Sequence, residues 1–134
     1  MTQRTISKKR VCATAISGLD GVRIVTINGE TKLELRSLLR MPRELFGRLV
    51  NVSVRTIAEV ESNQKKVEKL RRNYVEVKRL CDSLEEVIRT EGLGEWFDCP
   101  NPAFGGLKPL EVIERGEIDR LWEMFYRLRS GAPG

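Results

Sequence analysis

Few side chains in this sequence are suited to catalysis, because the chain contains no histidine. Histidine is the commonest general base and the commonest metal ligand in proteins. The three cysteines, Cys12, Cys81 and Cys99, are odd in number and far apart, which argues against a disulfide framework and a closed zinc site. No pair of carboxylates lies among apolar residues in the way typical of a tuned pKa. The sequence therefore predicts a protein that is not an enzyme, with no metal and no cofactor, and with reduced thiols in the cytoplasm.

The charged residues favour binding instead. Residues 1–90 carry 19 Lys and Arg against 11 Asp and Glu, whereas residues 91–134 carry 5 against 8. The net positive charge of residues 1–90 thus favours binding to polyanions, whereas the net negative charge of residues 91–134 does not. The sequence contains no run of 18 apolar residues and begins with a polar segment, so we expect neither a membrane span nor a signal peptide.

The first thirty residues form a basic arm followed by an extended segment. Arg4, Lys8, Lys9 and Arg10 lie in a stretch with almost nothing to bury, which indicates either a mobile basic arm or a solvated tail. The β-branched run at 22–27 precedes Asn28 and Gly29, a dipeptide that favours a hairpin. The spacing of Thr31 and Glu34 instead matches a capping box. We expect a helix from Thr31, preceded by at most one short strand.

Residues 42–61 show two helical patterns separated by only two residues. Asn51 suits the left-handed backbone of a sharp turn, and Ser53 suits the cap of the helix that follows. A side chain at Gly47 would push the two crossing helices apart. This arrangement predicts a helix-turn-helix.

The segment MPRELFGRLVNVSVRTIAEVESN resembles the helix-turn-helix of the Xre/phage-repressor family. The residues that fall where this family keeps its framework are Met41, Leu49, Val52, Ser53, Thr56, Ile57, Val60 and Glu61. The resemblance implies that the helix over 53–59 enters the major groove of DNA. An alternative is a helix-turn-helix retained as a dimerising or scaffolding unit.

The resemblance assigns candidate DNA-binding residues. Arg55 can satisfy both acceptors on guanine, and Val54 can pack on a thymine methyl group. Arg43, Lys65 and Lys66 are candidates for phosphate contacts. The full set of predicted DNA-binding residues is Arg43, Ser53, Val54, Arg55, Thr56, Lys65 and Lys66. Glu59 places a negative charge near the expected groove.

A longer helix is expected over about 67–90, with Val77, Leu80, Cys81, Leu84, Val87 and Ile88 on its inner face. Gly92 and Gly94 would end it. A loop with alternating proline and glycine residues follows, then a short helix from Pro109 to an exit at Gly116. The last helix, over 117–129, would turn Ile118, Leu121, Trp122, Phe125 and Leu128 inward.

The last 45 residues resemble the toxin-binding domain of Xre/MbcA/ParS-type antitoxins. The matching residues are Trp96, Pro100, Asn101, Pro102, Ala103, Phe104, Gly105, Gly106, Pro109, Leu110, Glu111 and Gly116. The resemblance implies an antitoxin whose partner is a RES-domain toxin that consumes NAD. The residues it suggests for toxin binding are Asn101, Phe104, Leu107, Glu111, Glu117, Asp119, Arg127 and Arg129. Structural roles remain open: Asn101 can close its loop, Glu117 and Asp119 can favour a helix start, and Trp96, Trp122 and Phe125 can be core residues.

The sequence as a whole predicts an all-α protein with at most one short strand near its start. The expected divisions are the arm and extended segment (1–30), the helix-turn-helix (31–65), a linking helix (66–90) and the toxin-binding domain (91–134). The expected function is that of a cytoplasmic antitoxin that occludes a RES-domain toxin and represses its own operon. Its expected partners are that toxin, operator DNA and a second copy of the chain, with no membrane partner. The rival hypothesis is a stand-alone helix-turn-helix regulator whose C-terminal domain serves only dimerisation.

Overall fold

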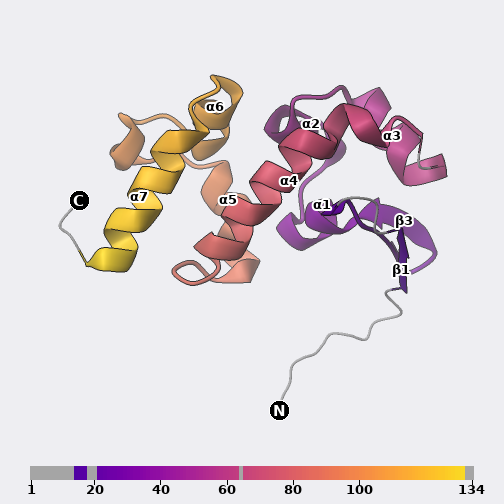
Figure 1. Ribbon diagram of the computed structural model, residues 1–134, viewed down its shortest axis with the longest axis horizontal. Helices are drawn as coiled ribbons and strands as arrows, with labels where there is room; N and C mark the ends of the chain where they lie inside the picture. Colours follow the sequence, from indigo (N-terminus) through magenta and orange to yellow (C-terminus); the bar gives the residue numbers. More distant parts are fainter. Residues whose placement is uncertain (1–13, 18–20, 64, 132–134) are drawn as a thin grey trace, which may run out of the picture.

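The chain folds mainly into helices, with a small sheet near the N-terminus (Figure 1). The computed structural model describes residues 14–17, 21–63 and 65–131. The described elements are β1 (Thr14–Ser17), β2 (Ile24–Ile27), β3 (Glu30–Leu33), α1 (Glu34–Leu39), α2 (Arg43–Val50), α3 (Val54–Asn63), α4 (Val67–Leu84), α5 (Thr90–Phe97), the 3₁₀ turn η3 (Pro102–Phe104), α6 (Pro109–Glu114) and α7 (Ile118–Ser130). The expected basic arm lies outside the described residues. The predominance of helix confirms the predicted fold class.

The N-terminal sheet is larger than the sequence predicted. Its antiparallel strands run in the order β1-β2-β3, and β2 pairs with β3 from Ile24↔Leu33 to Ile27↔Glu30. The expectation of a helix from Thr31 is wrong, because Asn28 and Gly29 both adopt positive φ (51° and 82°) and form a tight hairpin. Thr31 is therefore a strand residue, and α1 begins only at Glu34.

Helices α2 and α3 form the predicted helix-turn-helix. Asn51 ends α2 with a left-handed backbone (φ 59°), and Ser53 Oγ accepts a hydrogen bond from the Thr56 N–H at 3.1 Å. A Cβ atom at Gly47 would lie 2.7 Å from the Val52 carbonyl oxygen, so any other residue would displace the turn. These local predictions are confirmed.

The long helix ends earlier than its apolar pattern suggested. Helix α4 stops at Leu84, and a turn leads into α5 at Thr90. Gly92 and Gly94 lie inside α5 instead of ending α4. A Cβ atom at Gly94 would lie 2.0 Å from the Leu39 carbonyl oxygen. Gly94 therefore permits a close crossing of α5 over the end of α1, a contact between distant elements that local patterns do not reveal.

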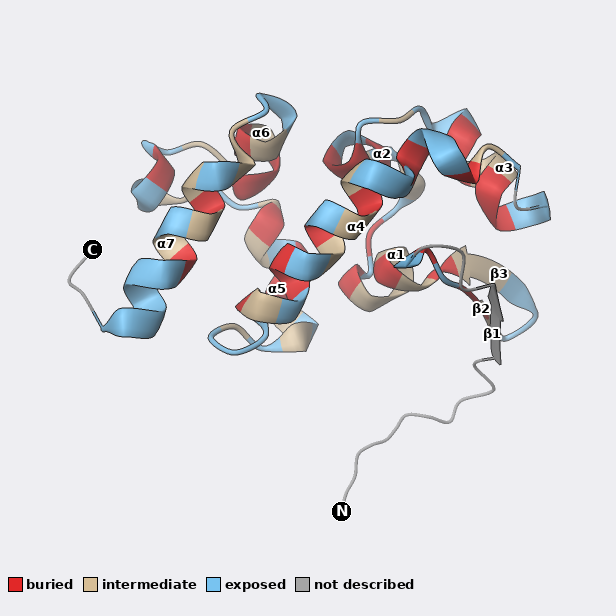
Figure 2. Cartoon of the chain, viewed as in Figure 1, coloured by how far each residue is buried: buried red, intermediate tan, exposed pale blue. Residues whose placement is uncertain are grey.

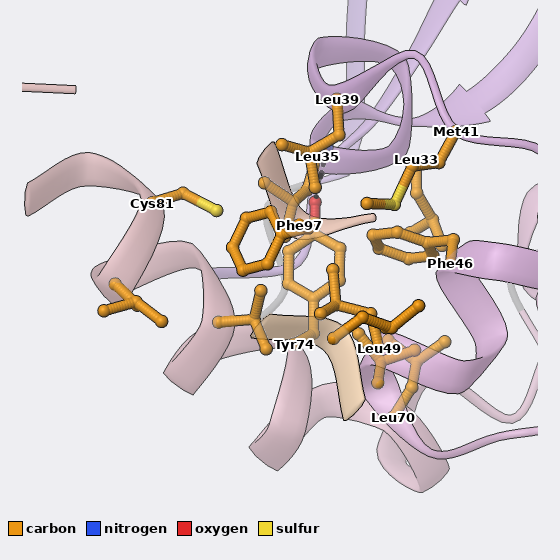
Figure 3. Packing of buried hydrophobic residues seen from close by; sticks show 14 of the residues in the cluster. Leu33, Leu35, Leu39, Met41, Phe46, Leu49, Leu70, Tyr74, Cys81 and Phe97 are labelled. Atoms are coloured by element: carbon orange, nitrogen blue, oxygen red, sulfur yellow. Dashed lines mark hydrogen bonds between the residues drawn. The ribbon is translucent and has the colours of Figure 1, made fainter. Parts of the chain in front are cut away.

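One hydrophobic cluster runs through the described structure, from Val22 beside the sheet to Phe125 on α7. Figure 3 shows Tyr74 and Phe97 among the leucines of α1 and α2, where the Tyr74 hydroxyl accepts a hydrogen bond from the Leu35 N–H at 3.0 Å. Cys81 is a core residue, as predicted, and burial raises the pKa of its thiol. The helix-turn-helix and the C-terminal helices thus share one core.

The C-terminal helices follow the predicted proline and glycine signals. Pro109 is the first residue of α6, and Gly116 leaves that helix with φ +80°. Helix α7 then packs Leu121 and Phe125 inward. Figure 2 shows that the last turns of α7 carry mostly exposed residues. Across the described ranges, no helix is both long and apolar enough to cross a membrane.

Candidate nucleic-acid and partner interfaces

The N-terminal part of α3 presents the exposed side chains of the helix-turn-helix. Ser53, Val54 and Arg55 are exposed, and Val54 retains 40% of its surface. Thr56 was also expected to face DNA, and this expectation needs correction. Its side chain is buried, and its hydroxyl lies 3.1 Å from the Ser53 hydroxyl. Thr56 and the Ser53 hydroxyl therefore stabilise the start of α3, which leaves Val54 and Arg55 as its exposed side chains.

A buried carboxylate holds α3 against the neighbouring elements. The Glu61 side chain is fully buried and accepts hydrogen bonds from Arg36 (2.7 Å), Arg43 (2.9 Å) and the Leu33 N–H (2.8 Å). Arg43 was expected to bind phosphate, but its Nε is used by Glu61. Because its side chain is 41% exposed, Arg43 still adds positive charge beside the helix-turn-helix.

The acidic Glu59 on α3 is paired with a lysine of the same chain. Its carboxylate lies 2.8 Å from Lys66 Nζ, and the hydrogen bond to Lys66 lowers the pKa of Glu59. Lys66 is thus paired within the chain, which weakens its expected role as a phosphate ligand. Lys65 remains exposed. The expected pair of phosphate-binding lysines is therefore reduced to Lys65 in this conformation.

The proline–glycine loop of the C-terminal module is closed by Asn101. Its side chain accepts a hydrogen bond from the Ala103 N–H (2.9 Å), while its backbone bonds to Leu107 and Gly106. Phe104 was expected to anchor a partner interface, and this too needs correction. Phe104 is only 2% exposed and lies beneath the Arg120 guanidinium, 5.8 Å from the ring centre. The loop turns its aromatic side chain inward and leaves Pro102 and Ala103 outside.

The other expected toxin-binding residues of this region differ in availability. Glu111 accepts a hydrogen bond from the Lys108 N–H (2.8 Å) at the start of α6, so one of its oxygens has a structural role. Glu117 pairs with Arg120 at 2.8 Å. Leu107 is half-buried against the core, whereas Asp119 is exposed. Among these side chains, Asp119 is the most accessible acidic group.

The end of α7 carries exposed apolar side chains that the sequence did not predict. Tyr126 is 57% exposed and Leu128 is 52% exposed, and Trp122 stacks on Tyr126 with ring centres 5.9 Å apart. Leu128 was expected in the core, but the last turn of α7 has too few neighbours to cover it. Arg127 and Arg129 are exposed beside it. Trp122, Tyr126 and Arg129 follow one another at intervals of four and three residues, so they share one face of α7. This spacing is the signal in the sequence that indicates an exposed face on the helix.

An ion pair joins the helix-turn-helix to the C-terminal helices. Arg48 on α2 donates two hydrogen bonds to the carboxylate of Glu114 on α6, at 2.7 and 2.8 Å. Arg48 holds the pKa of Glu114 below its usual range through the charged hydrogen bond. Glu114 also borders the hollow at the turn between α2 and α3, together with Val54. The C-terminal module therefore reaches the edge of the candidate DNA-binding surface.

The described residues contain no group of three or more Cys, Asp or Glu side chains arranged to hold a metal ion. Together, the helix-turn-helix and the exposed end of α7 define two candidate binding surfaces on one helical body.

The fold belongs to a class in which a helix-turn-helix is followed by a small helical module. No protein-family model matches the sequence, and no curated protein matches it. Among solved structures, the chain is similar to one from the crystal structure of the M. tuberculosis MbcT–MbcA toxin–antitoxin complex, with a TM-score of 0.61 and 23% sequence identity. The match covers 74% of this chain and 90% of that chain. The expected resemblance is thus confirmed for the fold.

Proposed function

We propose that this chain is an antitoxin that binds a RES-domain, NAD-consuming toxin through its C-terminal module and binds operator DNA through α3, thereby repressing its own operon. The observation that carries this proposal is the fold match to a chain of a toxin–antitoxin complex, which spans nine tenths of that chain. In this account the protein performs no chemistry and acts as a cytoplasmic homodimer on DNA.

The end of α7 supports the toxin-binding part of the proposal. Tyr126 and Leu128 are the most exposed large hydrophobic residues of the described chain, and they lie among Arg127 and Arg129. Aromatic and arginine residues are enriched where protein interfaces have their strongest contacts. Asp119, at the start of the same helix, can pair with the cations that a toxin needs to bind the pyrophosphate of NAD. We therefore place the toxin along α7.

The surface of α3 supports the DNA-binding part. Arg55 and Val54 are exposed at the start of the second helix, the position from which this motif reaches base edges. Glu59 does not oppose this role, because Lys66 neutralises it. The excess of positive charge in residues 1–90 adds an attraction that does not depend on sequence.

The toxin contact is tested with the purified RES-domain toxin that we expect to be encoded beside this chain. The double variant Tyr126→Ala/Leu128→Ala should bind it at least tenfold more weakly than wild type in calorimetry, because both side chains lose interface burial. Val87→Ala, which removes a 42% exposed side chain from the turn before α5, should bind like wild type. Equal binding by all three proteins would remove α7 from the interface.

The DNA contact is tested by titrating duplex from the chain's own promoter at fixed salt. Arg55→Ala should lose about 1–3 kcal/mol of affinity for the operator, while its affinity for unrelated duplex falls much less. If Arg55→Ala and wild type bind the operator equally, α3 does not read the bases. Strong operator binding without any toxin contact would favour the rival, a stand-alone regulator.

A further inference from the structure

A positively charged hollow lies between the sheet and the first helices, separate from the exposed end of α3. We call it the β3–α1 hollow, and its lining residues are Lys32, Arg36, Ser37, Arg40, Met41 and Pro42. Three of these residues are cations and none is acidic. Such a concentration of positive charge is suited to an anion.

The partners of these cations show which charge is free. Arg36 is fully used, because it bonds to Glu61 and donates to the Met41 carbonyl oxygen at 3.0 Å. Lys32 Nζ lies 3.9 Å from the carboxylate of Glu30, which is largely exposed to solvent. Among the described residues, the Arg40 guanidinium has no hydrogen-bond or ion-pair partner. Lys32 and Arg40 therefore supply the available charge.

The backbone at Arg40 is unusual for an arginine. Arg40 ends α1 with φ 56° and ψ 38°, a left-handed conformation in which glycine is favoured. Its N–H bonds to the Ser37 carbonyl oxygen at 3.2 Å, which fixes the position from which the side chain leaves the helix. An arginine held at such a site suggests a use for its side chain beyond ending the helix.

The hollow also has a defined edge and a defined neighbour. On its other side, Arg40 borders a second hollow that is lined by three carboxylates, Glu91, Glu95 and Asp98, so the positive surface does not extend over α5. Towards the helix-turn-helix, Pro42 precedes the first residue of α2. In this motif the first helix crosses the DNA backbone while the second enters the groove. The β3–α1 hollow is thus next to the element that meets the backbone.

From this placement we infer that the β3–α1 hollow binds a phosphate of the DNA backbone beside the groove read by α3, with Lys32 and Arg40 as its ligands. The inference rests on the proposed DNA binding and adds to it a contact made by the sheet and the end of α1. A phosphate contact of this kind anchors the protein without reading sequence. It would also orient the hairpin of β2 and β3 towards the duplex.

The test measures how the affinity of the full chain for duplex DNA depends on salt. The slope of log K against log salt is negative. Arg40→Gly should reduce its magnitude by about 0.9, and Arg40→Gly/Lys32→Ala should reduce it by about 1.8. Affinity should fall equally for operator and unrelated duplex, so their ratio stays constant. Arg40→Lys should keep most of the slope. Arg79→Ala, which removes an exposed cation near the C-terminal end of α4, should not change it.

The folded state should survive these changes, because glycine is favoured at the backbone conformation of residue 40. Thermal unfolding of Arg40→Gly at or above the wild-type temperature would show this directly. If Arg40→Gly and the double variant keep the wild-type slope, the hollow does not bind a phosphate. The proposed DNA binding would still stand if Arg55→Ala loses operator affinity. If the wild-type chain binds no duplex, the phosphate contact and the proposed DNA binding fail together. Inorganic phosphate is added as a competitor of labelled duplex, at matched ionic strength. If it displaces the labelled duplex as well as unlabelled duplex does, the hollow binds free phosphate instead of the DNA backbone.

Discussion

Two glycines in α5 should respond oppositely to the same substitution. Gly92 and Gly94 are two residues apart in one helix, yet a Cβ at Gly92 meets nothing within 4 Å, whereas one at Gly94 would lie 2.0 Å from the Leu39 carbonyl oxygen. This is about 1.4 Å short of ordinary van der Waals contact. Since the obstacle is backbone, α1 and α5 must separate to admit a methyl group.

The magnitudes follow from this geometry. Overpacking a close contact costs about 1–3 kcal/mol, and a backbone displacement of this size belongs at the upper end. Alanine regains about 0.5–1 kcal/mol of helix propensity at either site. Gly94→Ala should therefore lower the free energy of unfolding by about 2 kcal/mol, and Gly92→Ala should raise it by about 0.5 kcal/mol.

Urea unfolding of the full chain, followed by circular dichroism, measures both changes. Gly92→Ala serves as the matched control, because it makes the same chemical change in the same helix. We expect a lower midpoint for Gly94→Ala and a slightly higher one for Gly92→Ala, with unchanged m-values. Equal stability of the two variants would refute the close crossing of α1 and α5, and with it the shared core of the two modules.

Three further changes test other contacts. Tyr74→Phe should cost about 1–3 kcal/mol by leaving the buried Leu35 N–H unpaired. Because burial raises the pKa of Tyr74, the wild type should lose more stability than the variant as pH rises above about 10; parallel losses in pH-dependent unfolding would contradict this. Glu61→Gln should cost about 3 kcal/mol in chemical denaturation, because Arg36 keeps a buried charge without its counterion; a change below about 1 kcal/mol would contradict this. Arg48→Met should cost about 0.5–1 kcal/mol at pH 7, as expected for a partly exposed pair. Because Arg48 lowers the pKa of Glu114, that difference should be present above about pH 4.3 and vanish as pH falls through the lowered pKa; a difference independent of pH would refute the pairing.

The features predicted correctly are those fixed by short-range chemistry. Asn51, Gly47 and Ser53 define the helix-turn-helix within a few residues, and Pro109 and Gly116 delimit α6 in the same way. The competing signals at Asn28–Gly29 and Thr31 were both local, and the hairpin prevailed. Thr31 donates its hydroxyl hydrogen bond to the Glu61 carbonyl oxygen, a contact thirty residues away that no local pattern contains.

The errors at the candidate sites have a common cause. Thr56, Phe104 and Leu128 were assigned to surface or core from helical spacing and residue type, but their exposure depends on which element lies opposite. Phe104 turns inward because the loop closed by Asn101 folds over the helices, while Leu128 is left exposed at the uncovered end of α7. Such choices are made by tertiary packing, which a single sequence does not specify.

We propose that this chain neutralises a toxin that consumes NAD. The most direct measurement is the NAD content of cells that express the RES-domain toxin from the same operon, alone or together with this chain. We expect NAD to fall with toxin alone, to be maintained by co-expression of the wild-type chain, and to fall again with Tyr126→Ala/Leu128→Ala at equal protein levels. NAD depletion that persists beside abundant, folded wild-type chain would show that the chain does not neutralise the toxin, as would an operon that encodes no such toxin.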